Sequence, residues 1–390
     1  MTADSRSDQL HRALTRFPAT LFQFDPRMGE GWYADRYFVR SRNALLHAQR
    51  DPIVTMQVFA KENGVVAGAF EVIRMLETQL APGYALRDLT IDTLLDGDAL
   101  TPWVPVMHVT GPYVAFAHLE TDYLGVLARR SLIASNVRRV MEAAHGRPVV
   151  FMGARHDDWR VQTPDGYAAQ VGGAGSVSSD AGGAWWGTRG VGTMPHALIA
   201  TFGGDVVAAT LAFTNYVRAR EPDVNIVSLV DYRNDVVTDA LAVARAMRER
   251  FGDGALTGVR VDTSERLTDI SLTDASLKGV NPPLVRLVRD ALDREGFAGV
   301  GIIVSGGFTP ARIRQFEEAG VPVTGYGVGS SLLGHNRGAT DGLINGCDYT
   351  ADVVRVDSEL QSKVGRAWQP NPLLVRLDPT RLGGAPGSAG

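Results

Sequence analysis

Two glycine-rich segments near the C-terminal end of the chain have the composition of a phosphate-binding site. Each follows a run of apolar residues, and the first leads into a sequence that begins like a helix. Glycine lets a ligand approach the backbone closely, and a helix N-terminus offers free N–H groups and a positive dipole end. Tight turns alone would use the same residues, but two such loops after successive strands favour a bound phosphate. The residues are Ser305, Gly306, Gly307, Gly327, Gly329 and Ser330.

Charged side chains follow three other apolar runs. Arg260 and Asp262 are two residues apart in a predicted strand, so they point to the same side of it. Burying both is unfavourable unless they form an ion pair or contact a ligand. Arg155 ends another predicted strand, and His196 precedes the apolar run ALIATF. A surface arginine and a capping or core histidine are the ordinary alternatives for these two residues.

The sequence lacks the motifs of several common enzyme classes. It has no G-x-S-x-G elbow, no P-loop lysine motif and no H-E-x-x-H pair, and its G-x-G segments lack the dinucleotide-binding pattern. The net charge of −4 argues against a general nucleic-acid binder. Cys347 is the only cysteine, which excludes an intramolecular disulfide and a thiolate metal cluster within one chain. We predict no metal site built by protein side chains.

The second half of the chain must position these residues. Apolar runs that predict parallel strands alternate with amphipathic runs that predict helices. Thr309, Pro310 and Gly320 have the types expected at the N-cap, the first position and the C-terminal end of the last of these helices. Strand–helix units in succession imply a parallel sheet that could close into a barrel. The predicted strands are 148–155, 225–232, 257–264, 299–307 and 323–329, and the predicted helices are 237–251, 283–295 and 309–319.

The first part of the chain has a different pattern. Short alternating segments and helical pieces indicate a mixed, partly antiparallel domain over 1–115. We therefore expect an α/β barrel domain over 116–346 and a segment over 347–380 that returns to the first domain, with a strand at 348–359. The remaining residues, 381–390, are predicted to be a disordered tail. No secretory signal or membrane span is evident, so the chain is predicted to be cytoplasmic.

Eight segments, in the same order, resemble the nicotinate phosphoribosyltransferase family of type II phosphoribosyltransferases. VGTMPHAL (191–198) is the most specific of them, and together the segments extend over most of 34–366. The resemblance implies an irregular TIM-like α/β barrel with an N-terminal α/β domain that the C-terminal segment completes. The other segments are ADRYFVR (34–40), VTGPY…LETDYLGVLA (109–128), FMGARH (151–156), GVRVDTS (258–264), VSGGF (304–308), GYGVGSSL (325–332) and ADVVRVDSELQSKVGR (351–366).

The same resemblance implies roles at a site shared between the subunits of a homodimer. Tyr37 would stack on a pyridine ring opposite Phe151 or a neighbour, and Arg155 would bind the nicotinate carboxylate. Ser178 lies about where relatives that use nicotinamide carry an aspartate, which favours the acid. Asp35 and Arg40 match the N-terminal motif, and Lys363 matches a C-terminal basic motif. His156 replaces a second basic residue of the family, and Asp157 and Asp158 after it depart from the family pattern.

The implied reaction is phosphoribosyl transfer from phosphoribosyl pyrophosphate to nicotinate. His196 would lie beside the donor, Arg260 and Asp262 would face its ribose and diphosphate, and the glycine loops would hold its 5′-phosphate. Mg²⁺ would enter with the diphosphate, and in relatives coupled to ATP the histidine accepts a phosphoryl group. The open alternatives are a decarboxylating quinolinate enzyme, a nicotinamide-using enzyme and a catalytically silent relative that binds nucleotides or phosphosugars.

Overall fold

The computed structural model describes residues 3–335 and 341–382, which form two compact units. Of the described residues, the first unit comprises 3–136, 167–172 and 344–382, and the second comprises 137–166, 173–335 and 341–343. The first boundary therefore falls inside helix α6 (Glu120–Ala143), whereas the sequence analysis placed it after residue 115. The helix continues without a break across this boundary, so no local sequence signal marks the boundary.

The first unit is built on a six-stranded sheet with the order β13-β12-β1-β5-β3-β14. Every pair of neighbours in it is antiparallel. The partly antiparallel α/β architecture predicted for this part of the chain is thus confirmed. A short antiparallel pair, β2 (Gly64–Val65) with β4 (Ala99–Leu100), accompanies the sheet. The six strands are β1 (Ile53–Ala60), β3 (Thr90–Thr93), β5 (Pro105–Pro112), β12 (Tyr349–Val356), β13 (Glu359–Leu360) and β14 (Val375–Arg376).

Helices contribute the rest of the first unit's core. Leu10 and Leu14 of the first helix are fully buried, as are Ile73 and Leu76 of the fourth. Their spacing of three or four residues is that of one helix face. The helices are α1 (Ala3–Arg16), α2 (Ala19–Phe22), α3 (Arg36–His47), α4 (Ala69–Thr78), α5 (Tyr113–Phe116) and the first part of α6.

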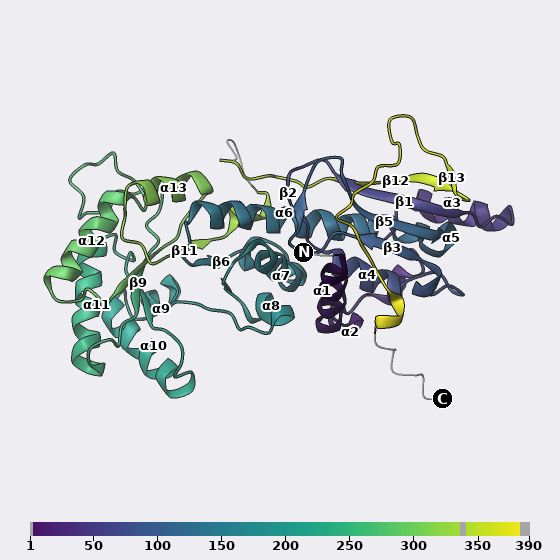
Figure 1. Cartoon of the computed structure of the whole chain (residues 1–390). Coiled ribbons are helices and arrows are strands. Elements are labelled where there is room, and N and C mark those ends of the chain that lie inside the picture. The colour runs from purple at the N-terminus through teal and green to yellow at the C-terminus, as the bar shows by residue number, and fades with distance from the viewer. Residues whose placement is uncertain (1–2, 336–340, 383–390) are drawn as a thin grey trace. The chain divides into compact units, whose positions relative to one another are not determined.

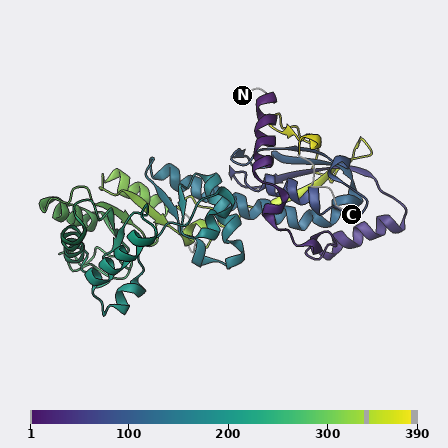
Figure 2. The same cartoon turned by 90° about the horizontal axis from the view of Figure 1, so that it is seen from below.

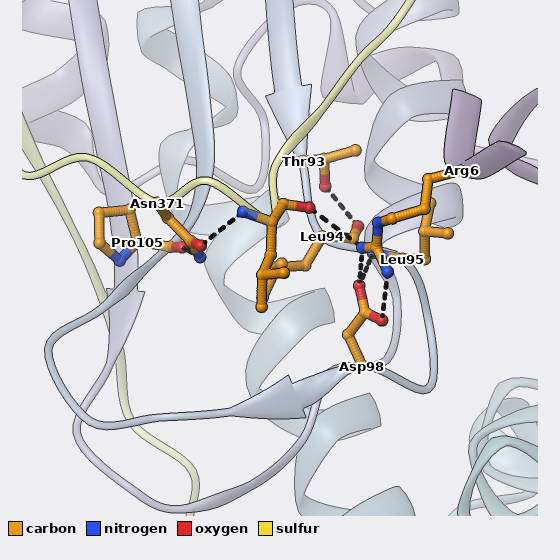
Figure 3. Close-up of polar contacts among 8 residues, drawn as sticks. Arg6, Thr93, Leu94, Leu95, Asp98, Pro105 and Asn371 are labelled. Carbon is orange, nitrogen blue, oxygen red and sulfur yellow. Dashed lines mark hydrogen bonds and ion pairs between the residues drawn. The ribbon is translucent and has the colours of Figure 1, made fainter. Parts of the chain in front are cut away.

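The C-terminal segment is part of the first unit. In Figures 1 and 2 the yellow strands of this segment lie beside the purple and blue strands, and they form the two edges of the sheet. Strand β12 pairs with β1 from Val54 with Val356 to Ala60 with Tyr349. Figure 3 shows how the segment is attached further on. Arg6 forms an ion pair with Asp98 and donates to the Leu373 carbonyl at 3.1 Å, while Asn371 donates to the Pro105 carbonyl at 2.7 Å.

The second unit contains a six-stranded parallel sheet with the order β7-β6-β11-β10-β9-β8. Five of these strands lie within the runs predicted from the sequence, and the parallel arrangement is confirmed. The two-residue strand β7 was not predicted. The strands are β6 (Val149–Phe151), β7 (Ser176–Val177), β8 (Val227–Leu229), β9 (Gly258–Val261), β10 (Gly301–Val304) and β11 (Gly325–Val328).

This sheet forms a curled half-barrel. Its ladder begins at β7 and ends at β8, and these two edge strands are not paired with each other in the described part of the chain. Between them the chain forms helices α8 (Asp180–Gly183), α9 (His196–Thr201) and α10 (Val206–Arg220) and no further strand. The predicted irregular barrel takes this open form because the 49 residues from 178 to 226 supply helices where a closed ring would need strands.

Helices surround the strands of the second unit, as Figure 1 shows for α11, α12 and α13. The last of them begins as predicted: the Thr309 side chain accepts from the backbone N–H of Arg312, Pro310 is its first residue, and Gly320 beyond its end has a φ of +59°. Both α11 and α12 are capped in the same way, by Asp235 and Asn281. The helices are α7 (Gln162–Gly172, which ends in the first unit), α11 (Val236–Phe251), α12 (Pro282–Arg294) and α13 (Pro310–Glu318).

Part of the predicted tail is ordered. Arg381 forms an ion pair with Asp8 at 2.8 Å, and Leu382 is buried. Residues 383–390 lie outside the described residues. Among the described helices, none combines the length and apolar character needed to cross a membrane.

Candidate active site

The register of the parallel sheet brings the predicted site residues to one edge. Leu229 is level with Arg260, Val261 with Val304, and Val304 with Tyr326. The residues that follow β8, β9, β10 and β11 therefore meet at the carboxyl edge, where open α/β sheets bind ligands. A cavity of about 590 Å³ lies there within the second unit. The predicted residues that line it are Arg155, His196, Arg260, Asp262, Ser305, Gly306, Gly307, Gly327, Gly329 and Ser330.

The loop after β10 requires both of its glycines. Gly306 and Gly307 have φ values of +91° and +65°, a region that other residues seldom adopt. A Cβ atom at position 306 would also lie 3.0 Å from Oδ1 of Asp262. These glycines thus place the loop against the strand end that carries Asp262, and α13 begins three residues after Gly307.

Gly327, within β11, and Gly329, directly after it, both lie close to Met152. A Cβ at Gly327 would lie 2.7 Å from Sδ of Met152, and one at Gly329 would lie 2.7 Å from the Met152 carbonyl oxygen and 2.8 Å from Nε2 of His156. The main chain of Met152 is fixed here because its N–H donates to the Val328 carbonyl at 2.7 Å. Close packing against the loop after β6 therefore demands glycine at position 329, in addition to any demand made by a ligand. At position 327 the contact is with the end of a flexible side chain, which can move.

Arg260 and Asp262 form the charged floor of the cavity. Asp262 accepts a hydrogen bond from Oγ of Ser305 at 2.8 Å. Burial lowers the pKa of Arg260, although Asp262 and Asp231 oppose this effect. Nε of Arg260 is buried and has no hydrogen-bond partner. A buried guanidinium N–H without an acceptor is costly, so this group is suited to an anionic ligand in the cavity.

His196 forms a pair with a carboxylate that the sequence analysis did not single out. Its Nε2 lies 3.1 Å from Oδ1 of Asp231, whose side chain is only 4% exposed, while the histidine side chain is 46% exposed. The hydrogen bond to Asp231 raises the pKa of His196, burial partly offsets this, and the negative charge of Asp231 adds to the increase. Asp231 follows β8 just as Asp262 follows β9, so its place at a strand end was the available signal.

Arg155 and His156 lie on the 3₁₀ turn η4 (Ala154–His156) and line the same cavity. Burial lowers the pKa of His156, and the charges of Arg155 and His335 lower it further. The two aspartates that follow make local contacts. Oδ1 of Asp157 accepts from the N–H of Asp158, and the Asp158 side chain accepts from the N–H of Arg160.

Two residues expected near the pyridine ring are not part of the cavity lining. Phe151 is 4% exposed, and its ring packs over Gly153, so the prediction that it faces the substrate is not supported by its position. The next residue, Met152, lines the cavity in its place, because successive residues of a strand point to opposite faces. Ser178 follows β7, is half-buried, and donates its N–H to the Phe151 carbonyl at 3.1 Å.

The remaining predicted residues belong to the first unit. Asp35 is the N-cap residue of α3, and its N–H donates to Oγ1 of Thr121 at 2.9 Å. Tyr37 is 59% exposed, and Arg40 and Lys363 are exposed as well. In the described part of the chain, no group of three or more His, Cys, Asp or Glu side chains could hold a metal ion.

Comparisons with known proteins agree with this architecture. A sequence model described as the N-terminal domain of quinolinate phosphoribosyl transferase matches residues 35–131. A nicotinate phosphoribosyltransferase of Mycobacterium tuberculosis is 32% identical over 258 residues, which are 65% of this chain and 52% of that protein. The chain thus spans about half the length of this curated relative.

Two solved structures are similar to most of the chain. The nicotinate-nucleotide pyrophosphorylase of Pyrococcus furiosus gives a TM-score of 0.71 at 29% identity, with 88% of this chain and 79% of that chain covered. Human nicotinic acid phosphoribosyltransferase gives a TM-score of 0.61 at 17% identity, with 84% and 75% covered, and this likeness concerns the fold alone. The antiparallel unit and the parallel half-barrel with its cavity at the carboxyl edge have the fold of type II phosphoribosyltransferases.

Within that class, the curated relatives that this chain matches in sequence are named nicotinate phosphoribosyltransferases, and the chain resembles them over about 60% of its length.

Proposed function

We propose that the protein transfers the phosphoribosyl group of phosphoribosyl pyrophosphate to nicotinate, forming nicotinate mononucleotide and pyrophosphate in NAD salvage. The main observation behind this proposal is that one cavity is lined by Arg155, His196, Arg260, Asp262 and the two glycine loops. The curated relatives that the chain matches over 65% and 62% of its length are named nicotinate phosphoribosyltransferases. A NAD salvage role is consistent with the cytoplasmic location expected from the sequence.

The chemistry requires charge separation more than acid–base catalysis. The lone pair of the pyridine nitrogen forms a bond to C1 of the ribose, while the bond from C1 to the diphosphate oxygen breaks and its electron pair leaves with pyrophosphate. The sugar becomes positively charged in between. Asp262, half-buried at the cavity, would stabilise that charge, and Arg260 with His196 would stabilise the leaving diphosphate. Positioning of the two reactants supplies much of the remaining rate.

Mg²⁺ would accompany the diphosphate of the donor. This ion usually retains several waters and takes one or two protein carboxylates in addition to substrate phosphates. Asp262 fits that requirement, because one of its carboxylate oxygens accepts from Ser305 and the other has no hydrogen-bond partner within the described chain. The ion would supply charge neutralisation at the diphosphate. Ser305 would hold the carboxylate in place.

ATP coupling would use the pair of His196 and Asp231. Nε2 of the histidine is held by the carboxylate, and the side chain is about half exposed at the cavity. With Nε2–H donating to the carboxylate, Nδ1 of the neutral ring would be the nitrogen that attacks the γ-phosphorus of ATP, while the bond to the bridging oxygen breaks and ADP leaves. The carboxylate would fix the orientation of the ring and stabilise the positive charge that the ring gains in this step. Retained radioactivity at His196 after incubation with γ-labelled ATP, absent in His196→Asn, would support coupling.

The test of the proposed function is a parallel assay with phosphoribosyl pyrophosphate and Mg²⁺, using nicotinate, nicotinamide and quinolinate, each with and without ATP. We expect nicotinate mononucleotide from nicotinate alone. Quinolinate is the second candidate substrate because the matching family model is that of quinolinate phosphoribosyl transferase. Carbon dioxide release with quinolinate would replace our proposal by that activity, and no product from any of the three would refute both.

A further inference from the structure

The loop that follows β10 accepts hydrogen bonds from an arginine that does not line the cavity. Nη1 of Arg312 donates to the Gly306 carbonyl at 2.6 Å and to the Gly307 carbonyl at 3.3 Å. Nη2 donates to the carbonyl of Val280, which precedes α12. Arg312 is the third residue of α13, and helical side chains point back toward the N-terminus, so it reaches the loop just ahead of its own helix.

Because the peptide bonds are trans, the position of the Gly306 and Gly307 carbonyls determines where the N–H groups of Gly307 and Phe308 point. In such a peptide the carbonyl and the N–H of the next residue point to opposite sides. With its carbonyls bound to Arg312, the loop must direct the N–H groups of Gly307 and Phe308 away from the guanidinium. Gly306, Gly307 and Phe308 line the cavity and Arg312 does not, so that direction is toward the cavity.

These two N–H groups have no acceptor among the residues that the structure describes. Among the described residues, neither the Gly307 nor the Phe308 N–H makes a hydrogen bond. Backbone donors are almost always satisfied in folded proteins, by solvent or a ligand where the chain supplies no partner. Two adjacent donors facing a cavity form a concave site that suits an anion.

Packing fixes the guanidinium in this position. It lies 4.5 Å from the centroid of the Phe308 ring, which is 1% exposed and packs against Phe316 and Tyr326. Burial lowers the pKa of Arg312, but an arginine side chain remains charged in proteins. The positive charge of the guanidinium therefore lies on the side of the loop away from the cavity. Its partial burial means that salt screens this charge less.

We infer that Arg312 is a positioning residue for a phosphate monoester: it orients the Gly307 and Phe308 N–H groups and adds positive charge behind them. The inference rests on the proposed function, since the phosphate monoester of that reaction is the 5′-phosphate of the donor. A guanidinium is needed because its fork binds two or more carbonyls at once, which a lysine ammonium on one flexible chain does less well.

The test is calorimetric titration with ribose 5-phosphate, with inorganic phosphate and ribose as separate arms. We expect the parent to bind ribose 5-phosphate, and Arg312→Ala to bind it roughly tenfold more weakly, which is about 1.4 kcal/mol. Nicotinate binding should be unchanged. In turnover, the KM for the donor should rise more than kcat falls. Arg314→Ala is the matched control, because Arg314 lies on the same helix and is exposed.

Arg312→Lys keeps the positive charge and tests whether the hydrogen bonds of the guanidinium to several carbonyls are needed. We expect an intermediate affinity, and this variant decides the matter if Arg312→Ala does not fold. Parent-like affinity in folded Arg312→Ala or Arg312→Lys, or equal losses in Arg312→Ala and Arg314→Ala, would overturn the inference. So would a parent that binds neither ribose 5-phosphate nor phosphate. A parent that binds ribose 5-phosphate but makes no nucleotide would instead refute the proposed function and leave this inference standing.

Discussion

At the scale of single residues, Asp262 is the side chain on which the proposed chemistry depends most. It carries negative charge at the cavity while its Oδ1 is held by Ser305. We expect Asp262→Asn to lower kcat by roughly 100-fold or more, the size of losing one electrostatic contact to a transition state. The melting temperature should change little, because asparagine can still accept from Ser305.

The control for this substitution is Asp290→Asn, which makes the same chemical change at an exposed position of α12. Activity should be unaffected there. Comparable turnover in Asp262→Asn and the parent, measured at saturating donor and nicotinate, would contradict the assigned role.

The pair of His196 and Asp231 makes a prediction about pH. Asp231 raises the pKa of His196 in the folded protein, so the pair stabilises the fold most below the unfolded pKa of histidine, about 6.5. This contribution is lost as the pH rises through the folded pKa. Asp231→Asn should therefore lower the melting temperature more at pH 5.5 than at pH 8.

Titration of the His196 ring by NMR checks the same point directly, with the signal assigned by its loss in His196→Gln. We expect the pKa of His196 to fall in Asp231→Asn. Because the histidine is about half exposed, solvent screening makes the stability effect modest. A pKa that does not move would show that Asp231 does not control this histidine.

At the scale of elements, the sequence predicted the units that have strong local signals. The helix predicted at 237–251 is α11 (Val236–Phe251), and the capping residues Thr309 and Pro310 define the start of α13 as expected. Strand β7 (Ser176–Val177) was missed because glycine and serine surround its two residues and leave no periodic pattern. The pairing of Asp231 with His196 joins residues 35 positions apart, so only the folded chain reveals it.

Packing between strand-end loops leads to a prediction for Gly329→Ala. The new methyl group would meet the Met152 carbonyl, a backbone atom that cannot move away easily, and the His156 ring. Overpacking of this kind costs about 1–3 kcal/mol. We expect a melting temperature lower by several degrees and a higher KM for the donor.

Gly299→Ala provides the matched control for this substitution, since a Cβ at Gly299 meets no atom within 4 Å and its φ is not in the left-handed region. Unfolding curves from calorimetry would compare the two variants. Equal melting temperatures would mean that the loop after β6 yields readily, and that the glycine is not required for packing.

At the scale of the whole molecule, we expect two copies of the chain to form the functional assembly. The family resemblance implies a homodimer in which Asp35, Tyr37 and Arg40 complete the site of the partner subunit. Tyr37 is 59% exposed in the single chain, which agrees with a side chain that contacts a partner subunit. In a symmetric dimer each chain would then contribute one half to each of two sites.

This arrangement predicts complementation between two inactive variants. Tyr37→Ala lacks the residue that one chain gives to its partner, and Asp262→Asn lacks the residue that it keeps. Random mixing makes half of the dimers mixed, and each mixed dimer holds one intact site out of two, so roughly a quarter of parental activity should return. Differently tagged chains, unfolded and refolded together, allow the mixed dimers to be isolated and assayed. Mixed dimers without activity would place Tyr37 and Asp262 in the same site of one chain, because then neither variant could supply what the other lacks.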